Sequence, residues 1–197
     1  MKKIIKLSLA FLLGVSLEGC SSHEESHEEE VGTYKVTIVV KNFGTIEGEL
    51  DGTEAPITVK NFVKLANEGF YDGLTFHRII KDFMIQGGDP LGNGTGGSDD
   101  EIKGEFSANG IENPLSHTRG AFSMARGNDY NSASSQFFIV HQDQFDLDGQ
   151  YAVFGYVTKG MDVVDKIAEN TPVTDDNGTV EKKNQPVITK ITVKEIK

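Results

Sequence analysis

Turns rich in glycine divide this chain into many short apolar segments, and that pattern limits the folds it can adopt. β-Branched and aromatic residues, which favour strands, are frequent in the segments 34–40, 45–50, 76–89, 120–124, 136–140, 151–157 and 187–196. Apolar residues recur at helical spacing in two segments, which begin after Ala55 and after Gly160. Strands and helices therefore do not alternate as they do in a parallel β/α sheet. We expect an all-β barrel with helical caps.

The composition narrows the class of protein further. Twenty-two glycines against five prolines agree with many tight turns. A formal net charge of −11 argues against nucleic-acid binding, which uses basic surfaces. The only cysteine cannot form an internal disulfide, so stability must come from the core. The 197 residues suit one domain with additional segments.

The first segment has the pattern of an export signal. Lys2, Lys3 and Lys6 precede an apolar run over residues 7–17, which is shorter than the ~20 residues that span a bilayer. The run ends in Leu17-Glu18-Gly19-Cys20, which resembles a bacterial lipoprotein signal apart from Glu18. We expect a signal peptide over residues 1–19 and a lipid on Cys20, which anchors the chain to the bacterial cell membrane outside the cytoplasm. The alternative is an ordinary signal peptide with an incidental cysteine.

A polar segment separates the signal from the domain. Residues 21–30 read SSHEESHEEE and contain no apolar side chain. Such a segment has nothing to bury, so we expect a disordered acidic tether over residues 20–32 and a domain over residues 33–197. His23 and His27 are four residues apart and suggest a weaker alternative, divalent-metal capture by the tether.

Two polar side chains interrupt the apolar segment 76–89, and both need an explanation. Arg78 and Gln86 lie among phenylalanine, isoleucine and methionine, where an unpaired polar group is costly. The simplest interpretation is a barrel strand whose outward residues are polar. By the same reasoning Phe83, Met84 and Phe138 are core residues, and His77 is structural.

The remaining polar segments suggest no further chemistry. The glycine-rich residues 93–97 lack the Gly-Lys-Ser/Thr ending of a phosphate-binding loop, so we interpret them as a turn. Residues 99–105 are acidic and expected to be solvated. His141 has no acidic or cysteine partner at catalytic spacing, so we expect it at the surface.

Residues 71–88 resemble the signature of the cyclophilins, a family of peptidyl-prolyl cis-trans isomerases. The shared residues are Tyr71, Phe76-His77-Arg78, Phe83-Met84 and Gln86-Gly87-Gly88. Further blocks in the same order agree: Asn93 to Gly97, His117 with Gly120, Ser123-Met124-Ala125, Ser135 to Ile139, Leu147-Asp148-Gly149 and Val153-Phe154-Gly155. The resemblance covers residues 33–197. It implies a closed antiparallel eight-stranded β-barrel capped by two α-helices.

The resemblance also implies a role for each matched residue. Arg78 corresponds to the catalytic arginine, and Gln86 belongs with it as a polar residue that positions the arginine and the substrate. The pocket for the substrate proline ring is expected to contain Phe83, Met84, Phe138 and Leu147. Contacts with the substrate peptide are expected from Ala125, Arg126, Gly127 and Gln136.

The sequence departs from the family at the rim of this site. Arg126-Gly127 stands where alanine or asparagine is common, and Tyr151 replaces a frequent histidine. We include Tyr151 among the substrate-binding residues. A tryptophan common in eukaryotic members is absent, with Asp146 nearest in register and Phe145 beside it. The missing tryptophan and histidine lower the expected affinity for cyclosporin more than the expected catalysis.

The implied activity is rotation about X–Pro peptide bonds of exported proteins. No covalent bond changes, so no cofactor, metal or nucleophile is expected. A fixed arginine beside an apolar pocket stabilises the twisted amide more than the planar one. The expected partners are proline-containing segments of unfolded or exported proteins, bound by a monomer. The alternative is a non-catalytic module that binds proline peptides or chaperones at the membrane surface.

Overall fold

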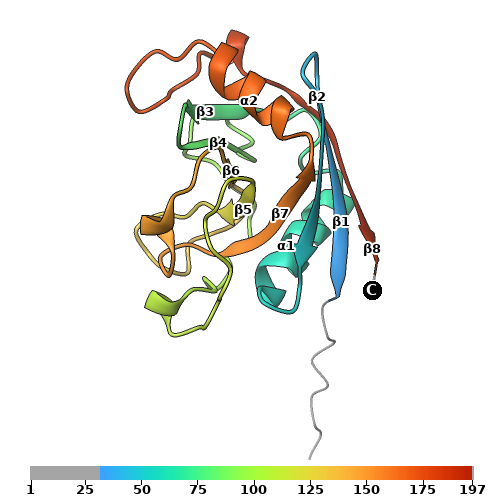
Figure 1. Cartoon of the computed structure of the whole chain (residues 1–197), viewed down its shortest axis with the longest axis vertical. Helices are drawn as coiled ribbons and strands as arrows, with labels where there is room; N and C mark the ends of the chain where they lie inside the picture. The colour runs from blue at the N-terminus through green and yellow to red at the C-terminus, as the bar shows by residue number, and fades with distance from the viewer. Residues whose placement is uncertain (1–31, 197) are drawn as a thin grey trace, which may run out of the picture.

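The computed structural model describes residues 32–196, which form one antiparallel sheet and two α-helices (Figure 1). Its strands are β1 (Thr33–Val40), β2 (Gly44–Asp51), β3 (Phe76–Ile80), β4 (Met84–Gly87), β5 (Ala121–Met124), β6 (Phe137–Val140), β7 (Val153–Lys159) and β8 (Ile188–Glu195). The helices are α1 (Pro56–Asn67) and α2 (Met161–Asn170). The expected strand-rich fold with two helices is confirmed. The predicted signal peptide, Cys20 and residues 21–31 of the predicted tether lie outside the described residues.

The sheet is an open half-barrel, so the prediction of a closed barrel is wrong. Its strand order is β3-β4-β6-β5-β7-β2-β1-β8, and β3 and β8 form no ladder with each other within residues 32–196. The free edge of β3 is covered by a loop instead. The Ile79 N–H donates to the Gly178 carbonyl oxygen (2.8 Å), and the Val180 N–H donates to the His77 carbonyl oxygen (3.0 Å). The only ladder of β8 within residues 32–196 is with β1, and the start of β8 reaches the β3 side of the sheet only through single contacts, such as the Ile188 N–H to the Leu74 carbonyl oxygen (2.7 Å).

The two faces of the sheet have different roles. Side chains alternate along a strand, and the row Ile79, Ile85, Ile139 and Phe122 crosses β3, β4, β6 and β5. These residues belong to the main core, which also contains the apolar faces of both helices. The neighbouring rows carry Met84, Phe138 and Val140, which form a second, smaller cluster. The second cluster lies on the sheet face opposite the main core.

The apolar segment 76–89 is a hairpin rather than one strand. β3 and β4 pair with each other around a turn at residues 81–83. In this turn Asp82 has a φ of 61°, a left-handed conformation that aspartate tolerates better than most residues. The turn reverses the chain, so the polar residues Arg78 and Gln86 stand opposite each other.

A buried carboxylate holds the start of α1. Glu105 is 2% exposed, and its two carboxylate oxygens accept the N–H groups of Ile57 (2.9 Å) and Thr58 (2.8 Å). These N–H groups lack partners inside the helix, and the helix dipole favours a negative charge there. The prediction of a wholly solvated acidic segment is therefore wrong at Glu105.

None of the helices formed by residues 32–196 is long and apolar enough to cross a membrane.

A second buried carboxylate shapes the glycine-rich loop. Asp89 Oδ1 accepts the Leu91 N–H (2.8 Å), and Oδ2 accepts those of Asn93 (3.0 Å) and Gly94 (2.6 Å). Burial opposes the ionisation of Asp89, but these donors outweigh it, so its pKa lies below the ordinary carboxyl value. The N–H groups at the start of the loop therefore point to the Asp89 carboxylate.

Replacing Glu105 by alanine should destabilise the fold, because two N–H groups lose a charged acceptor. We expect a loss of about 2–3 kcal/mol, measured by urea denaturation. Glu101→Ala is the matched control, since Glu101 is an exposed acidic residue of the same segment, and should cost less than about 0.5 kcal/mol. Equal effects of the two changes would contradict the capping role.

Asp89 should make stability depend on pH in the acid range. A lowered folded-state pKa contributes stability above the unfolded carboxyl pKa of ~3.9, and this stability is lost as the pH falls through the folded value. In Asp89→Asn the amide nitrogen cannot accept the two N–H groups at Oδ2. The variant should be less stable than wild type at neutral pH, and the gap should close toward pH ~2–3. Melting temperatures from pH 2 to 7 test this; parallel curves would refute it, and the exposed Asp99→Asn should follow wild type.

Candidate active site

One row of cross-strand neighbours lies at the centre of the site. Arg78 on β3 stands opposite Gln86 on β4, and Gln86 stands opposite Phe138 on β6. Directly opposed residues of antiparallel strands point to the same face. Here that is the face of the smaller cluster, so a cation, an amide and an aromatic ring are adjacent there.

Three hydrogen bonds orient the Arg78 guanidinium. Nη1 donates to Gln86 Oε1 (3.1 Å), Nε donates to the Asn177 carbonyl oxygen (2.9 Å), and Nη2 donates to Asn177 Oδ1 (3.3 Å). A guanidinium has five N–H groups, so two remain beyond these bonds for a ligand. Burial lowers the pKa of Arg78 from its ordinary value, yet a guanidinium stays charged at neutral pH.

An apolar surface adjoins the guanidinium. Met84 and Phe138 are buried, and Phe83, Leu147 and Tyr151 pack against them. The Arg78 guanidinium carbon lies 5.9 Å from the Phe83 ring centre. The polar and apolar halves of the site therefore meet at Phe83.

These residues line a cavity of about 410 Å³. It brings together the predicted residues Arg78, Phe83, Met84, Gln86, Ala125, Arg126, Phe138, Leu147 and Tyr151. The other predicted residues, Gly127 and Gln136, line an adjacent groove of about 570 Å³, which shares Gln86, Gly94, Ala125 and Arg126 with the cavity. The cavity and the groove are therefore continuous along these shared residues.

Gln136 links the arginine to the glycine-rich loop. Its Oε1 accepts Gln86 Nε2 (2.9 Å), while its Nε2 donates to the carbonyl oxygens of Gly96 (2.7 Å) and Gly94 (3.2 Å). Gln86 in turn accepts from Arg78. The two amides thus form a relay of hydrogen bonds between the guanidinium and the loop that Asp89 orders.

Arg126 is held against aromatic rings at the rim. Its guanidinium carbon lies 4.7 Å from the centre of Tyr151, 4.8 Å from Tyr130 and 5.3 Å from Phe106. Nε and Nη2 both donate to the Gln150 carbonyl oxygen (3.1 and 3.0 Å). The family departure at this position therefore supplies a fixed cation between the cavity and the groove.

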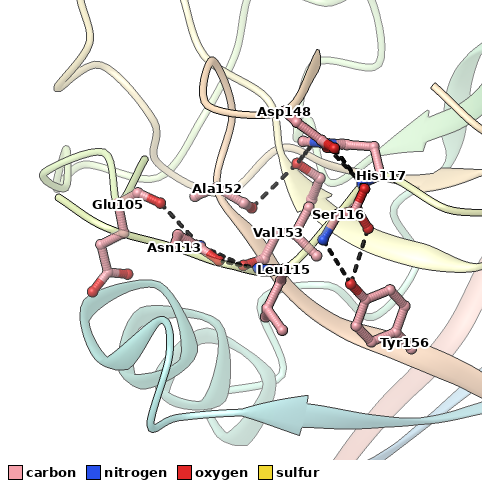
Figure 2. Close-up of polar contacts among 10 residues, drawn as sticks. Glu105, Asn113, Leu115, Ser116, His117, Asp148, Ala152, Val153 and Tyr156 are labelled. Carbon is pink, nitrogen blue, oxygen red and sulfur yellow. Dashed lines mark hydrogen bonds and ion pairs between the residues drawn. The ribbon is translucent and has the colours of Figure 1, made fainter. Parts of the chain in front are cut away.

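Behind the apolar surface lies a polar network, whose His117 is buried and whose Asp148 is exposed (Figure 2). His117 Nδ1 lies 2.7 Å from Asp148 Oδ1, which also accepts the His117 N–H (2.7 Å), and Asp148 Oδ2 accepts Ser116 Oγ (2.5 Å). Tyr156 Oη accepts the Ser116 N–H and donates to its carbonyl oxygen, both at 2.9 Å. The His117 ring stacks on Phe138 at 6.0 Å between centres. The network supports the ring of Phe138 from behind.

The same network contains a serine, a histidine and an aspartate in hydrogen-bond contact. His117 Nε2 lies 2.9 Å from Ser123 Oγ, and burial lowers the pKa of His117, which keeps the ring neutral. Ser123 and His117 are both 0% exposed, so no substrate carbonyl can reach the hydroxyl. The arrangement is a structural support and not the nucleophilic site of a hydrolase.

Several cavity residues were missed by the sequence reasoning. His77, Gly92, Asn93, Gly94, Asn177 and Thr179 also line the cavity. Neither ring nitrogen of His77 has a hydrogen-bond partner among the described residues, and burial lowers its pKa. Asn177 follows Arg78 by almost a hundred residues in a polar loop, and no local pattern marks it.

The described part of the chain contains no group of three or more His, Cys, Asp or Glu side chains that could hold a metal ion. The two histidines of the tether lie outside it.

Comparisons with known proteins agree with this geometry. A family model described as "Cyclophilin type peptidyl-prolyl cis-trans isomerase/CLD" matches residues 35–194. The chain is 54% identical over 117 residues to peptidyl-prolyl cis-trans isomerase B of Bacillus subtilis, covering 59% of this chain and 78% of that one. It is 45% identical over 147 residues to a peptidyl-prolyl cis-trans isomerase of Helicobacter pylori, covering 74% and 87%.

A solved structure gives the same result for the fold. A cyclophilin type peptidyl-prolyl cis-trans isomerase of Cryptosporidium parvum, crystallised in the presence of the dipeptide Ala-Pro, superposes with a TM-score of 0.72 at 31% identity. The match covers 82% of this chain and 99% of that one. Because the family model matches almost all of the described residues, this chain belongs to the cyclophilin-type peptidyl-prolyl cis-trans isomerases.

Proposed function

We propose that this chain, a peptidyl-prolyl cis-trans isomerase, uses Arg78 to stabilise the rotating X–Pro bond of its substrate. Rotation about a peptide bond has a barrier of ~18–20 kcal/mol because it interrupts the amide resonance. In the twisted state the proline nitrogen regains its lone pair and becomes a better hydrogen-bond acceptor. A donor fixed beside that nitrogen therefore binds the transition state more strongly than the ground state.

The observation that carries this proposal is the fixed orientation of Arg78 by acceptors of the chain itself. Gln86 and Asn177 fix three of its N–H groups, so little reorganisation is needed during the reaction. Phe83, Met84, Phe138 and Leu147 line the same cavity and offer an apolar surface to the proline ring. Excluding water from this side strengthens the interaction of the guanidinium with the nitrogen.

The proposed substrates are proline-containing segments of unfolded or exported proteins. The Cryptosporidium parvum relative was crystallised with the dipeptide Ala-Pro, and a similar dipeptide unit suits a cavity of about 410 Å³. The adjoining groove at Gly127 and Gln136 is proposed to hold the residues before the proline. Its backbone groups and amides suit an extended peptide.

A second candidate function is peptide binding without catalysis. It is favoured by the exposed apolar residues Phe145 and Leu91, which are 59% and 57% exposed, lie close in sequence to the cavity residues Leu147 and Gly92, and suit apolar contacts with unfolded chains. A pure binder has no need for a guanidinium held by three hydrogen bonds. An isomerisation assay on a proline peptide without a coupled protease separates the two functions, since a binder leaves the exchange rate unchanged.

We further propose that the enzyme acts outside the cytoplasm as a lipid-anchored protein. The support lies in the sequence alone: a basic start, a short apolar run and Cys20 at its end. The acidic segment after Cys20 would separate the domain from the membrane.

Replacing Arg78 by alanine should lower kcat/KM on an X–Pro peptide by about 10²-fold or more, because losing one preorganised donor typically costs ~2.7–4 kcal/mol of transition-state stabilisation. Exchange spectroscopy at equilibrium gives the rate. Lys81→Ala is the control, since Lys81 is an exposed cation of the same hairpin, and should retain wild-type activity. Near wild-type activity of the Arg78 variant would remove Arg78 from the mechanism.

Cys20→Ala should abolish lipid attachment in the bacterial host. Metabolic labelling with a radioactive or clickable fatty acid should mark the wild-type chain, and fractionation should find it with the membrane. The variant should be unlabelled. A labelled variant, or an unlabelled wild type, would refute the anchor without bearing on the isomerase activity.

A further inference from the structure

His141 is buried beside the active site, contrary to the expectation of a surface histidine. It follows β6 directly, and its side chain is 3% exposed. Its backbone N–H donates to the Phe83 carbonyl oxygen (2.8 Å), which extends the β4–β6 ladder by one step. The residue therefore touches the turn at residues 81–83, which carries a wall residue of the cavity.

The His141 ring holds this turn by a second contact. Nδ1 accepts the backbone N–H of Asp82 (2.9 Å). The ring nitrogen that accepts this bond carries no proton, so the neutral ring has its proton on Nε2. Asp82 is the residue with the left-handed φ of 61°, and its carbonyl oxygen accepts Gln144 Nε2 (3.0 Å). The His141 ring thus holds the N–H group of Asp82, and the His141 backbone holds the carbonyl group of Phe83. These two groups lie on either side of the peptide bond between Asp82 and Phe83.

Arg119 connects His141 to α2, because Asp165 Oδ1, the atom nearest His141 Nε2, has no hydrogen-bond partner among the described residues. His141 Nε2 lies 3.2 Å from the carboxylate of Asp165, which pairs with Arg119 Nη2 at 2.8 Å. Arg119 Nη1 donates to the His141 carbonyl oxygen (2.6 Å), and the Arg119 N–H donates to Asp143 (2.7 Å). The Asp82 carboxylate lies 3.7 Å from Nδ1. A turn with a left-handed residue is thereby tied to a helix of the main core.

We propose that His141 is a positioning residue for the isomerase reaction, which sets the place of Phe83 in the cavity wall without touching the substrate. Phe83 adjoins both the apolar surface and the Arg78 guanidinium, so a displaced turn changes the fit of the proline ring. The proposal rests on the proposed function of the cavity. It predicts that the acceptor atom at the Nδ1 position matters, and not merely the volume of the ring.

Three substitutions separate the acceptor from the volume. His141→Asn keeps an oxygen where Nδ1 lies and can still accept the Asp82 N–H. His141→Gln places its amide near the Nε2 position, and His141→Leu has no polar atom. Val164→Ala is the control for simple destabilisation, because Val164 is a fully buried core residue of α2 that takes no part in the turn.

The kinetic expectation follows from the role of Phe83 as a binding surface. His141→Leu and His141→Gln should raise KM about five- to tenfold, with kcat changed less than about threefold, because the proline ring is held in both ground and transition states. His141→Asn should stay within about twofold of wild type. Val164→Ala should lower the melting temperature and leave KM unchanged.

Amide hydrogen exchange at Asp82 tests the same contact without any substrate. The Asp82 amide should exchange slowly in wild type and in His141→Asn. It should exchange about tenfold faster in His141→Leu and His141→Gln, as expected for the loss of one hydrogen bond. Slow exchange in all variants would overturn the proposal.

The remaining outcomes are also decisive. Equal KM values for His141→Asn and His141→Gln, or a raised KM in Val164→Ala, would show that His141 only stabilises the fold. Either result would overturn the positioning role. If His141→Leu fails to fold, the comparison of asparagine with glutamine decides alone. An inactive wild type with the expected exchange pattern would refute the proposed function while leaving the tie between His141 and the turn intact.

Discussion

The antiparallel pairing of β3, β4 and β6 is the constraint on which the site depends. Because side chains alternate along each strand, one register sends Ile79, Ile85 and Ile139 into the main core and Arg78, Gln86 and Phe138 to the opposite face. A slip of one residue would exchange the two sets. The burial of the isoleucines therefore fixes the position of the arginine, although none of them touches the cavity.

The open edge of the sheet contributes to the site as well. A closed barrel would pair β3 with β8, and the backbone N–H and carbonyl groups at the edge of β3 would then bond to β8. Instead residues 177–180 cover that edge, and Asn177 supplies two of the three acceptors that orient Arg78. Replacing a strand by a loop thus brings to the guanidinium one residue that offers two acceptors, a backbone carbonyl oxygen and a side-chain amide oxygen.

Polar residues hold the loops around the cavity to this scaffold. Asp89 orders the glycine-rich loop, the His117–Asp148 pair supports Phe138, and His141 holds the turn before Met84. Asp89, Asp148 and His141 each accept a backbone N–H group of the segment that they hold. Hydrogen bonds at the glycine-rich loop, behind Phe138 and at the turn before Met84, together with the apolar packing of the smaller cluster, therefore keep the cavity in shape.

The sequence alone determined the strand-rich class, both helices and most residues that line the candidate site, because periodicity and the matched blocks are local properties. It also identified Arg78 and Gln86 as polar residues that needed a role, although their opposition across a hairpin was not foreseen. The tertiary structure decided the open sheet, the burial of Glu105 and His141, and the contribution of Asn177. These depend on which distant segments reach a strand edge, a helix end or a turn, and a pattern of neighbouring residues carries no record of such contacts.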